Sequence, residues 1–400
     1  MVRITLTPRD RMCRALSGQK TDVVPAAPAY LSLFLADFQR AYYIEEYRRR
    51  MRGRSRYPVD HEEDTFLRAQ ALYQSYGIFK AWPDWIEVHP GASRAWSERT
   101  DIVQQDGRLY YEDKRSGRRV PMEAAPLPHG DASLNVLTPS SVDVWDTSDQ
   151  IQSEADVDAR LPVLTGDEWL ARGDFDLPRQ VIADYGDRFF ISTILGTPFS
   201  SAYDLLGFQG LMLIQHDRPA LLHYVLRRYL ARSKEYMNAW AALGIHGVYV
   251  EEVFTGADMI SPDSYDEYVF PYNQALFSHL SDLGLLSIYY ICGDAVPRLD
   301  RIAGLDIAAV AVEESKKNFR IEIEEVVDRV AGRMAVFGNI DAVRFGLHAR
   351  LEDMAAEVRR QARIGAKARG FVVSTGSPFP LDTNPRLVDT LVTTAHSLAG

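Results

Sequence analysis

The sequence is poor in cysteine and has no long apolar run. Its 400 residues contain two cysteines, Cys13 and Cys292, which excludes a disulfide framework and gives no sign of an oxidising compartment. No apolar run approaches the ~20 residues that a membrane-spanning helix needs. The polar helix start soon after Met1 does not resemble a signal peptide. We therefore expect a cytoplasmic protein with no membrane partner.

Positive charge and glycine-rich motifs are also scarce. The formal net charge of -10 argues against nucleic acid as a partner, because neutralising phosphates requires a basic face. Arginines do cluster between Arg48 and Arg56, where we expect a solvated linker, with a clamp for an anionic ligand as the alternative. No glycine-rich phosphate fingerprint follows the first apolar run, which disfavours an open doubly wound sheet.

What the sequence does contain is a regular alternation of apolar runs and amphipathic stretches. A helix is predicted to begin at Pro8, capped by Thr7 and ended by Gly18. Strands alternating with helices indicate parallel pairing, and eight such strands favour a (β/α)8 TIM barrel formed by a single domain over residues 1–400. The predicted strands are Val23–Ala29, Trp85–His89, Phe189–Leu195, Gly247–Phe254, Leu286–Cys292, Ile307–Glu313, Met334–Ile340 and Gly370–Thr375.

Residues 96–180 do not follow this alternation. Asp106-Gly107 lies between two apolar runs, which is a strong hairpin signal. A second turn at Ser116-Gly117 leads to Val120. We predict an insertion that carries a three-stranded antiparallel meander.

Polar residues follow the predicted barrel strands at their carboxyl ends, where the function of a TIM barrel is located. Burial of such groups without partners is costly, so their number indicates a site. Asp341 and Ser377 are alternatively caps of the helices that follow. We predict catalytic roles for Glu251, Tyr290, Asp294, Asn339 and Asp341, and substrate or cofactor binding by Tyr30, Thr197, Tyr203, Glu252, Glu313 and Ser377.

Aromatic residues also lie near the strand ends, Tyr30 and Tyr203 among them. They are either stacking platforms for a flat ligand or ordinary core residues. Two histidines have predicted positions. His61 is expected at a solvated helix start, and His246, before a strand, is expected to be structural.

Several segments together resemble the uroporphyrinogen decarboxylase superfamily, in the right order over nearly the whole chain. The resemblance implies the barrel fold. The matching segments are Thr7–Arg11 through Asp22–Pro25, Ile260–Pro262 with Tyr268 and Pro271-Tyr272, Ile291–Asp294, Gly338–Asp341 and Ser374–Pro378.

The sequence departs from both well-known branches of that superfamily. True porphyrinogen decarboxylases hold substrate carboxylates with arginines near the first strand, whereas Pro25–Tyr30 contains none. Zinc-dependent members of the methyltransferase branch use His-x-Cys and a second Cys, and the corresponding residues here are Tyr290, Cys292 and Ser377. Tyrosine and serine are poor zinc ligands, so zinc is not expected.

The resemblance therefore implies a zinc-independent methyltransferase. It would move a methyl group between a methylated substrate or methylcobamide and an acceptor such as tetrahydrofolate, an amine nucleophile that needs no metal. The sequence has no Asp-x-His-x-x-Gly cobalamin motif, so the corrinoid (cobalamin) is expected on a partner corrinoid protein or free. Relatives often pair, which makes a homodimer an option.

Three alternatives stay open at this point. Cys292 is either a small buried side chain or a metal ligand together with carboxylates such as Glu251, Glu252 or Glu313. The protein is alternatively a decarboxylase or other lyase acting on a small carboxylated substrate. It is also conceivable as a non-catalytic binding protein that has lost the ancestral metal site.

Overall fold

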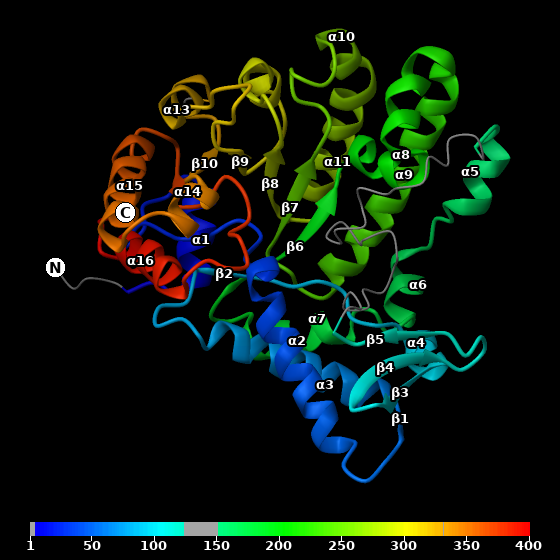
Figure 1. The fold of residues 1–400 in the computed structure, drawn as a ribbon. Helices are drawn as coiled ribbons and strands as arrows, with labels where there is room; N and C mark the ends of the chain where they lie inside the picture. The colour runs from blue at the N-terminus through cyan, green and yellow to red at the C-terminus, as the bar shows by residue number, and fades with distance from the viewer. Residues whose placement is uncertain (1–4, 124–150, 331) are drawn as a thin grey trace.

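A parallel β-sheet forms the centre of the computed structural model, which describes residues 5–123, 151–330 and 332–400 (Figure 1). Neighbouring strands are parallel throughout, in the spatial order β11-β10-β9-β8-β7-β6-β2. The strands are β2 (Trp85–Glu87), β6 (Phe190–Gly196), β7 (Gly247–Glu252), β8 (Leu286–Ile291), β9 (Ala309–Val312), β10 (Ala335–Phe337) and β11 (Phe371–Val372). The predicted α/β alternation with parallel pairing is confirmed.

Helices connect the strands and cover the outer face of the sheet (Figure 1). They are α1 (Pro8–Leu16), α2 (Leu31–Arg50), α3 (His61–Tyr76), α4 (Arg94–Arg99), α5 (Glu154–Arg160), α6 (Gly166–Ala171), α7 (Asp176–Tyr185), α8 (Pro198–Asp217), α9 (Pro219–Ala242), α10 (Pro262–Ser264), α11 (Phe270–Asp282), α12 (Leu299–Ile302), α13 (Ile323–Val330), α14 (Ala342–Leu347), α15 (Leu351–Gly365) and α16 (Pro385–His396). Among the described residues, none of these helices combines the length and apolar character needed to cross a bilayer.

The predicted first strand, Val23–Ala29, is much shorter than expected. It is reduced to a single parallel bridge between Ala26 and Val373, because Pro25 and Pro28 have no N–H to donate to a ladder. The segment nevertheless hydrogen bonds toward both edges of the curled sheet. The amide of Ala27 donates to the carbonyl of Val373 at 2.9 Å, and the amide of Asp84, next to β2, donates to the carbonyl of Ala26 at 2.8 Å.

The curled sheet separates two apolar cores. Side chains alternate along each strand, so Tyr249 of β7 packs inside the curl with Trp85 and Phe337, whereas Val248 and Val250 pack outward against the helices. Helix α1 closes the amino end of the curl with the apolar face that the sequence predicts, Met12, Ala15 and Leu16. Thr7 caps this helix by accepting a hydrogen bond from the amide of Asp10 at 3.0 Å.

The antiparallel sheet has one strand more than predicted. Its order is β1-β3-β4-β5, and it packs on α2 and α3, apart from the parallel sheet (Figure 1). The strands are β1 (Arg56–Pro58), β3 (Thr100–Gln105), β4 (Arg108–Asp113) and β5 (Arg119–Pro121). Strand β1 lies far from the others in sequence, so no local hairpin signal revealed it. Residues 124–150 of the predicted insertion lie outside the described residues, and its extent stays a prediction.

The arginines between 48 and 56 are divided between a helix, an exposed turn and a strand. Helix α2 continues through Arg50, and Arg56 belongs to β1. Arg56 pairs with Asp101 at 2.7 Å and Glu112 at 2.5 Å, and Arg48 pairs with Glu123 at 3.1 Å. The linker interpretation is therefore correct for the exposed turn that carries Arg52 and Arg54, and wrong for Arg48 and Arg56, which belong to α2 and β1.

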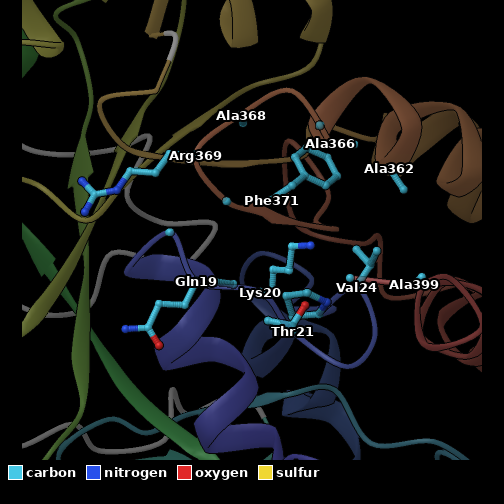
Figure 2. Close-up of a pocket in the computed structure, with 16 residues that line it drawn as sticks. Gln19, Lys20, Thr21, Val24, Ala362, Ala366, Ala368, Arg369, Phe371 and Ala399 are labelled. Atoms are coloured by element: carbon cyan, nitrogen blue, oxygen red, sulfur yellow. The ribbon is translucent and has the colours of Figure 1, made fainter. Parts of the chain in front are cut away.

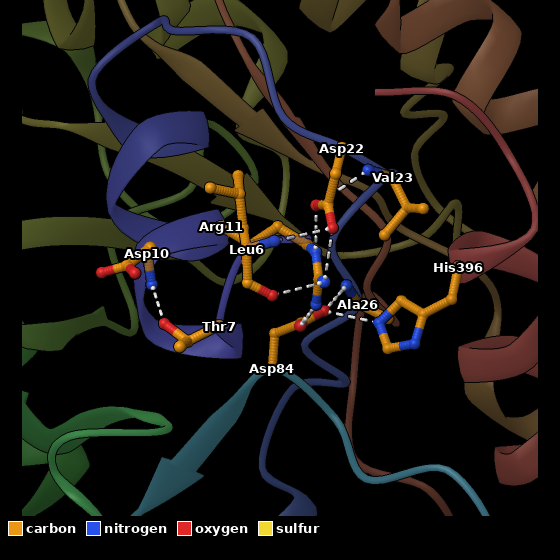
Figure 3. Close-up of polar contacts among 9 residues, drawn as sticks. All are labelled: Leu6, Thr7, Asp10, Arg11, Asp22, Val23, Ala26, Asp84 and His396. Atoms are coloured by element: carbon orange, nitrogen blue, oxygen red, sulfur yellow. Dashed lines mark hydrogen bonds and ion pairs between the residues drawn. The ribbon is translucent and has the colours of Figure 1, made fainter. Parts of the chain in front are cut away.

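A buried ionic network fastens the amino end of the curl (Figure 3). Arg11 of α1 pairs with Asp84 and, at 2.8 Å, with Asp22. Asp84, which is fully buried, also accepts hydrogen bonds from the amide of Ala26 at 2.8 Å and from His396 of α16 at 2.7 Å. Burial opposes ionisation of Asp22, but its hydrogen bonds to Arg11 and the Leu6 amide hold its pKa at about 2. This network connects α1, β2 and α16.

Candidate active site

Alternation along β7 sends its two adjacent glutamates to opposite sides of the sheet. Tyr249 faces the interior of the curl, so Glu251 faces the interior as well, while Glu252 faces the helices. In the sheet register Glu251 lies beside Tyr290 of β8. The predicted site residues are therefore divided between an interior group and an outer group.

Three tyrosines form the floor of the interior group. The ring centroids of Tyr249 and Tyr290 are 5.3 Å apart in a stacked arrangement. Tyr30 packs edge-on against both rings, at 5.4 Å and 5.5 Å. The hydroxyl of Tyr290 donates to the carbonyl of Gly376 at 2.8 Å. The predicted Tyr30 and Tyr290 are thus brought together, and Tyr249 of β7 packs against both.

Tyr30 reaches this position through an unusual backbone conformation. It precedes α2 with φ 50° and ψ 39°, in the left-handed region. A bulky residue adopts that region at a cost of order ~1 kcal/mol or more and keeps it only where the surroundings hold it. Here the conformation turns the chain from Pro25–Ala29, the closing segment, into α2. It leaves the phenol ring almost fully buried.

Carboxyl groups lie close to these tyrosines. Burial raises the pKa of Glu251, and the nearby hydroxyl of Tyr30 opposes that rise. Burial also raises the pKa of Glu313. The Gly293 amide, which donates to this carboxyl at 2.9 Å, and Lys316 both oppose that rise. Burial therefore favours the protonated form of both carboxyls relative to a fully exposed glutamate.

Cys292 lies among these carboxyls as a thiol. Burial raises its pKa well above the ordinary value, and the charges of Glu251 and Glu313 raise it further. Such surroundings disfavour the thiolate, which is the form that binds metals. In the described parts of the chain, no group of three His, Cys, Asp or Glu side chains is placed to hold a metal ion. The hydroxyl of Ser377 donates to Glu314 at 2.9 Å.

Glu252 is the centre of the outer group. It is fully buried and accepts hydrogen bonds from Asn273 at 2.7 Å, Ser200 at 2.9 Å and Tyr289 at 3.1 Å. Burial raises its pKa to about 7, although these donors favour the ionised form. Thr197 caps α8 beside it, 3.0 Å from the Ser200 hydroxyl. Both predicted binding residues thus lie between sheet and helices rather than in the interior.

The other predicted residues hold loops at the carboxyl end. Asn339 donates to the carbonyls of Glu313 and Ile321, both at 3.1 Å. Asp341 caps α14, as the alternative interpretation expected. The amide of Asp294 donates to Asp258 at 2.9 Å.

Tyr203, on α8, belongs to neither the interior nor the outer group. Its ring packs against Phe254 at 5.0 Å between centroids, and Phe254 also contacts Phe208.

Sequence reasoning missed Glu87, the last residue of β2. It lies two residues after the interior residue Trp85 and therefore on the same face of the strand. The residue is 1% exposed. Burial raises its pKa to about 8, against hydrogen bonds from the amides of Ser32 and Leu31. The rule that chemistry lies at strand ends did not identify it, because the predicted run Trp85–His89 ends two residues later than β2 does.

Both His61 and His246 have hydrogen-bond partners within the fold. His61 begins α3 and contacts Asp176 at 2.8 Å. The ring of His246 accepts a hydrogen bond from the Ile191 amide at 2.9 Å, and burial lowers its pKa to about 4. A neutral His246 that anchors β6 agrees with the structural role expected of it.

A cavity lies at the opposite, amino end of the curl (Figure 2). Alanine and glycine residues form most of its wall, and Lys20 and Arg369 contribute its cationic side chains. None of the predicted site residues lines it. It therefore does not belong to the carboxyl-end site.

Comparison with known proteins places this geometry in context. Residues 175–398 match the family described as "Uroporphyrinogen decarboxylase (URO-D)". Among curated relatives, the uroporphyrinogen decarboxylase of Salinispora tropica is 24% identical over 63% of this chain and 66% of its own length. That of Nocardia farcinica is 26% identical over 51% of this chain and 58% of its own length. The chain thus spans less than two thirds of either relative.

A solved structure extends the likeness over the whole chain. A methyltransferase from Methanosarcina mazei superposes with a TM-score of 0.61 at 16% identity, covering 98% of this chain and 99% of its own. At that identity the likeness concerns the fold alone.

Proposed function

Since the chain belongs to the uroporphyrinogen decarboxylase family, we propose that it is a corrinoid-linked methyltransferase of that family. It would move a methyl group between a methylated substrate or methylcobamide and an acceptor such as tetrahydrofolate. The fold shared with a methyltransferase from Methanosarcina mazei is compatible with this proposal.

The observation that carries the proposal is the charge of the interior site. Glu87, Glu251 and Glu313 face the inside of the curl, and the closing segment contributes alanine side chains where porphyrinogen decarboxylases would need arginine. A substrate with several carboxylates requires charge-assisted hydrogen bonds. Ionised carboxyls at these positions would repel such a substrate.

The chain's own residues would position the substrate and manage its proton. Glu251, beside the Tyr30 hydroxyl, would act as general acid or base, since burial raises its pKa. Asn339 would hold the loop after β9 through the Glu313 carbonyl. Tyr290 and Tyr249 would form the surface on which the reacting group rests.

The corrinoid would supply a cobalt centre. The methyl group would move between that centre and the substrate. Aromatic side chains near the carboxyl end fit a flat macrocycle: Tyr203 packs on Phe254, and Phe208, in contact with Phe254, is 44% exposed. We propose that they contact a corrinoid that a partner protein delivers. The zinc-free character of the site and a homodimeric state are further parts of the proposal.

We also propose that the sheet closes into a full (β/α)8 barrel. The Pro25–Ala27 segment would serve as the eighth strand, supported by its hydrogen bonds toward β11 and β2. Closure would gather the interior residues around one mouth.

Methyl transfer can be followed directly. Purified protein incubated with methylcob(III)alamin and tetrahydrofolate should change the cobalt absorbance. Replacement of Glu251 by Gln should slow that change about a hundredfold or more if the carboxyl transfers a proton. The exposed Glu325→Gln variant is the matched control and should retain the wild-type rate. No spectral change with any acceptor, together with no corrinoid binding, would remove the proposal.

Decarboxylation is the second candidate, because the curated relatives are named uroporphyrinogen decarboxylases. Carbon dioxide released from uroporphyrinogen, with a less carboxylated porphyrin recovered after oxidation, would favour it over methyl transfer.

A further inference from the structure

The interior site holds the buried carboxyl of Glu87 and the partly buried carboxyls of Glu251 and Glu313. Among the residues that the structure describes, no lysine or arginine lies within ion-pair distance of Glu87 or Glu251. Lys316 is 4.0 Å from Glu313 but lies closer to Glu314, with which it forms its main ion pair. Ionising a buried carboxyl without a partner costs several kcal/mol. Burial therefore favours the protonated form of these carboxyls, and a positive charge that enters the site would favour their ionised form.

Glu87 shows directly where a partner is missing. One carboxyl oxygen accepts the Ser32 amide at 3.2 Å, at the start of α2. The other oxygen is buried and has no hydrogen-bond partner, although the residue is 1% exposed. Buried polar atoms are nearly always paired with protein or ligand groups. Glu87 lies two residues after Trp85 on the same strand, so its carboxyl faces the interior as Trp85 does. Burial raises the pKa of Tyr249, and the nearby Glu87 contributes to that rise.

The tyrosine floor adds a second feature that favours cations. Tyr30, Tyr249 and Tyr290 are packed within 5.3 to 5.5 Å of one another. Aromatic faces attract ammonium groups through the ring quadrupole, and methylated ammonium ions are bound in this way because they cannot be held by hydrogen bonds. Carboxyls close to aromatic rings therefore form an environment that favours an organic cation over a neutral or anionic molecule.

We propose that the interior site binds a small N-methylated cation, a quaternary ammonium or protonated methylamine, as the methyl donor. This inference rests on the proposed methyltransferase function and narrows its substrate class. In the transfer, the bond between the methyl carbon and the positive nitrogen breaks, and its electron pair stays on nitrogen. The acceptor would be a reduced, cobalt(I) corrinoid delivered by the partner protein, which would supply the electron pair of the new bond to the methyl carbon. A quaternary donor leaves as a neutral tertiary amine, so no proton is consumed.

Binding can be tested without turnover. Isothermal titration calorimetry compares choline with its neutral isostere, in which a tert-butyl group replaces the trimethylammonium group. We expect choline to bind at least about tenfold more tightly, because only the cation interacts with carboxylates and aromatic faces. Glu87→Gln and Glu251→Gln should each weaken choline binding about tenfold while leaving the isostere unchanged. The surface variant Glu325→Gln is the matched control, and circular dichroism checks the fold of every variant.

The pH dependence gives an independent readout. Choline does not titrate, so any change reports on the protein. Burial raises the pKa of Glu87 to about 8, hence choline affinity should rise from about pH 6 to about pH 9 as the carboxyls lose their protons. The affinity of the isostere should stay flat.

The outcomes separate this inference from the proposed function. Equal affinity for choline and its isostere, or unchanged choline binding in both folded Gln variants, would overturn the cation site. Methyl transfer from neutral methyl ethers without any binding of choline would overturn it while leaving the methyltransferase intact. Selective choline binding with no methyl transfer would support the site and remove the proposed function.

Discussion

At the scale of single residues, the two adjacent glutamates of β7 show how one peptide bond separates two environments. Glu251 faces the interior tyrosines, and Glu252 is enclosed by Asn273, Ser200 and Tyr289. All three partners of Glu252 are neutral, so they satisfy its oxygens without compensating a full charge. This is why its pKa rises to about 7 despite a complete set of donors.

Glu252 should therefore make stability depend on pH. Its ordinary pKa is 4.5 and its folded pKa is about 7, so between these values the native state binds more protons than the unfolded chain. The free energy of unfolding must then fall as pH rises through that window, by about 3 kcal/mol in all. Glu252→Gln stays neutral and should gain about that much on the wild type between pH 5 and pH 8. Urea unfolding at both pH values measures the difference.

The surface variant Glu325→Gln provides the comparison for this experiment. Its difference from the wild type should not change with pH. A Glu252→Gln difference that is equally flat would show that Glu252 titrates normally in the folded protein.

At the scale of elements, one ionic network joins α1, the segment before α2, the start of β2 and α16. Arg11 supplies its positive charge and holds two carboxylates, Asp22 and the fully buried Asp84. Because burial makes an unpaired carboxylate costly, the network is stable only while all its members are present.

Arg11→Met should consequently destabilise the protein by about 3–5 kcal/mol, since it leaves two acidic groups without their cation. Arg9→Met is the matched control on the same helix. The Arg9 side chain is 34% exposed and its partners lie 3.4 Å away, so its loss should stay within about 0.5 kcal/mol. Chemical denaturation measures both. Equal, small losses would mean that the network contributes nothing to stability.

At the scale of the whole molecule, the interior of the curl is filled rather than open along its length. Trp85 of β2 is fully buried and packs against Tyr249 and Phe337 at centroid distances of 5.7 Å and 6.0 Å. Helix α1 covers the amino end beneath them. The proposed site would therefore be reached from the carboxyl end. The Trp85 side chain joins the packing of β2, β7 and β10.

Trp85→Ala should cost about 3–5 kcal/mol, because the surrounding rings belong to different strands and cannot collapse into the space. Phe66→Ala is the comparison: Phe66 is 50% exposed, and its loss should shift the free energy of unfolding by about 0.5 kcal/mol or less. Denaturant titrations compare the two. A Trp85→Ala variant as stable as Phe66→Ala would show that the interior packing is dispensable.

Local patterns in the sequence predicted much of this architecture. The apolar β-branched runs predicted β6 to β11 within a few residues, and Thr7-Pro8 predicted the start of α1. Asp106-Gly107 predicted the β3–β4 hairpin. These signals were readable because each depends on periodicity or turn chemistry within a few residues.

Long-range contacts were not readable. The pairing of β1 with β3 joins Arg56–Pro58 to residues near 102, and it brings Asp101 to Arg56. The first strand shortened to one bridge because two prolines interrupt it. No local pattern encodes these outcomes.

The amino-acid sequence by itself determined the order of strands and helices and the gathering of polar residues at one end of the sheet. Tertiary structure alone decided which of those residues share a space. Alternation relative to the curl placed Glu251 inside and Glu252 outside, and it brought the overlooked Glu87 toward Tyr249. The physical reason is that facing and burial, which set charge and pKa, depend on how the sheet curves and on what packs against each side.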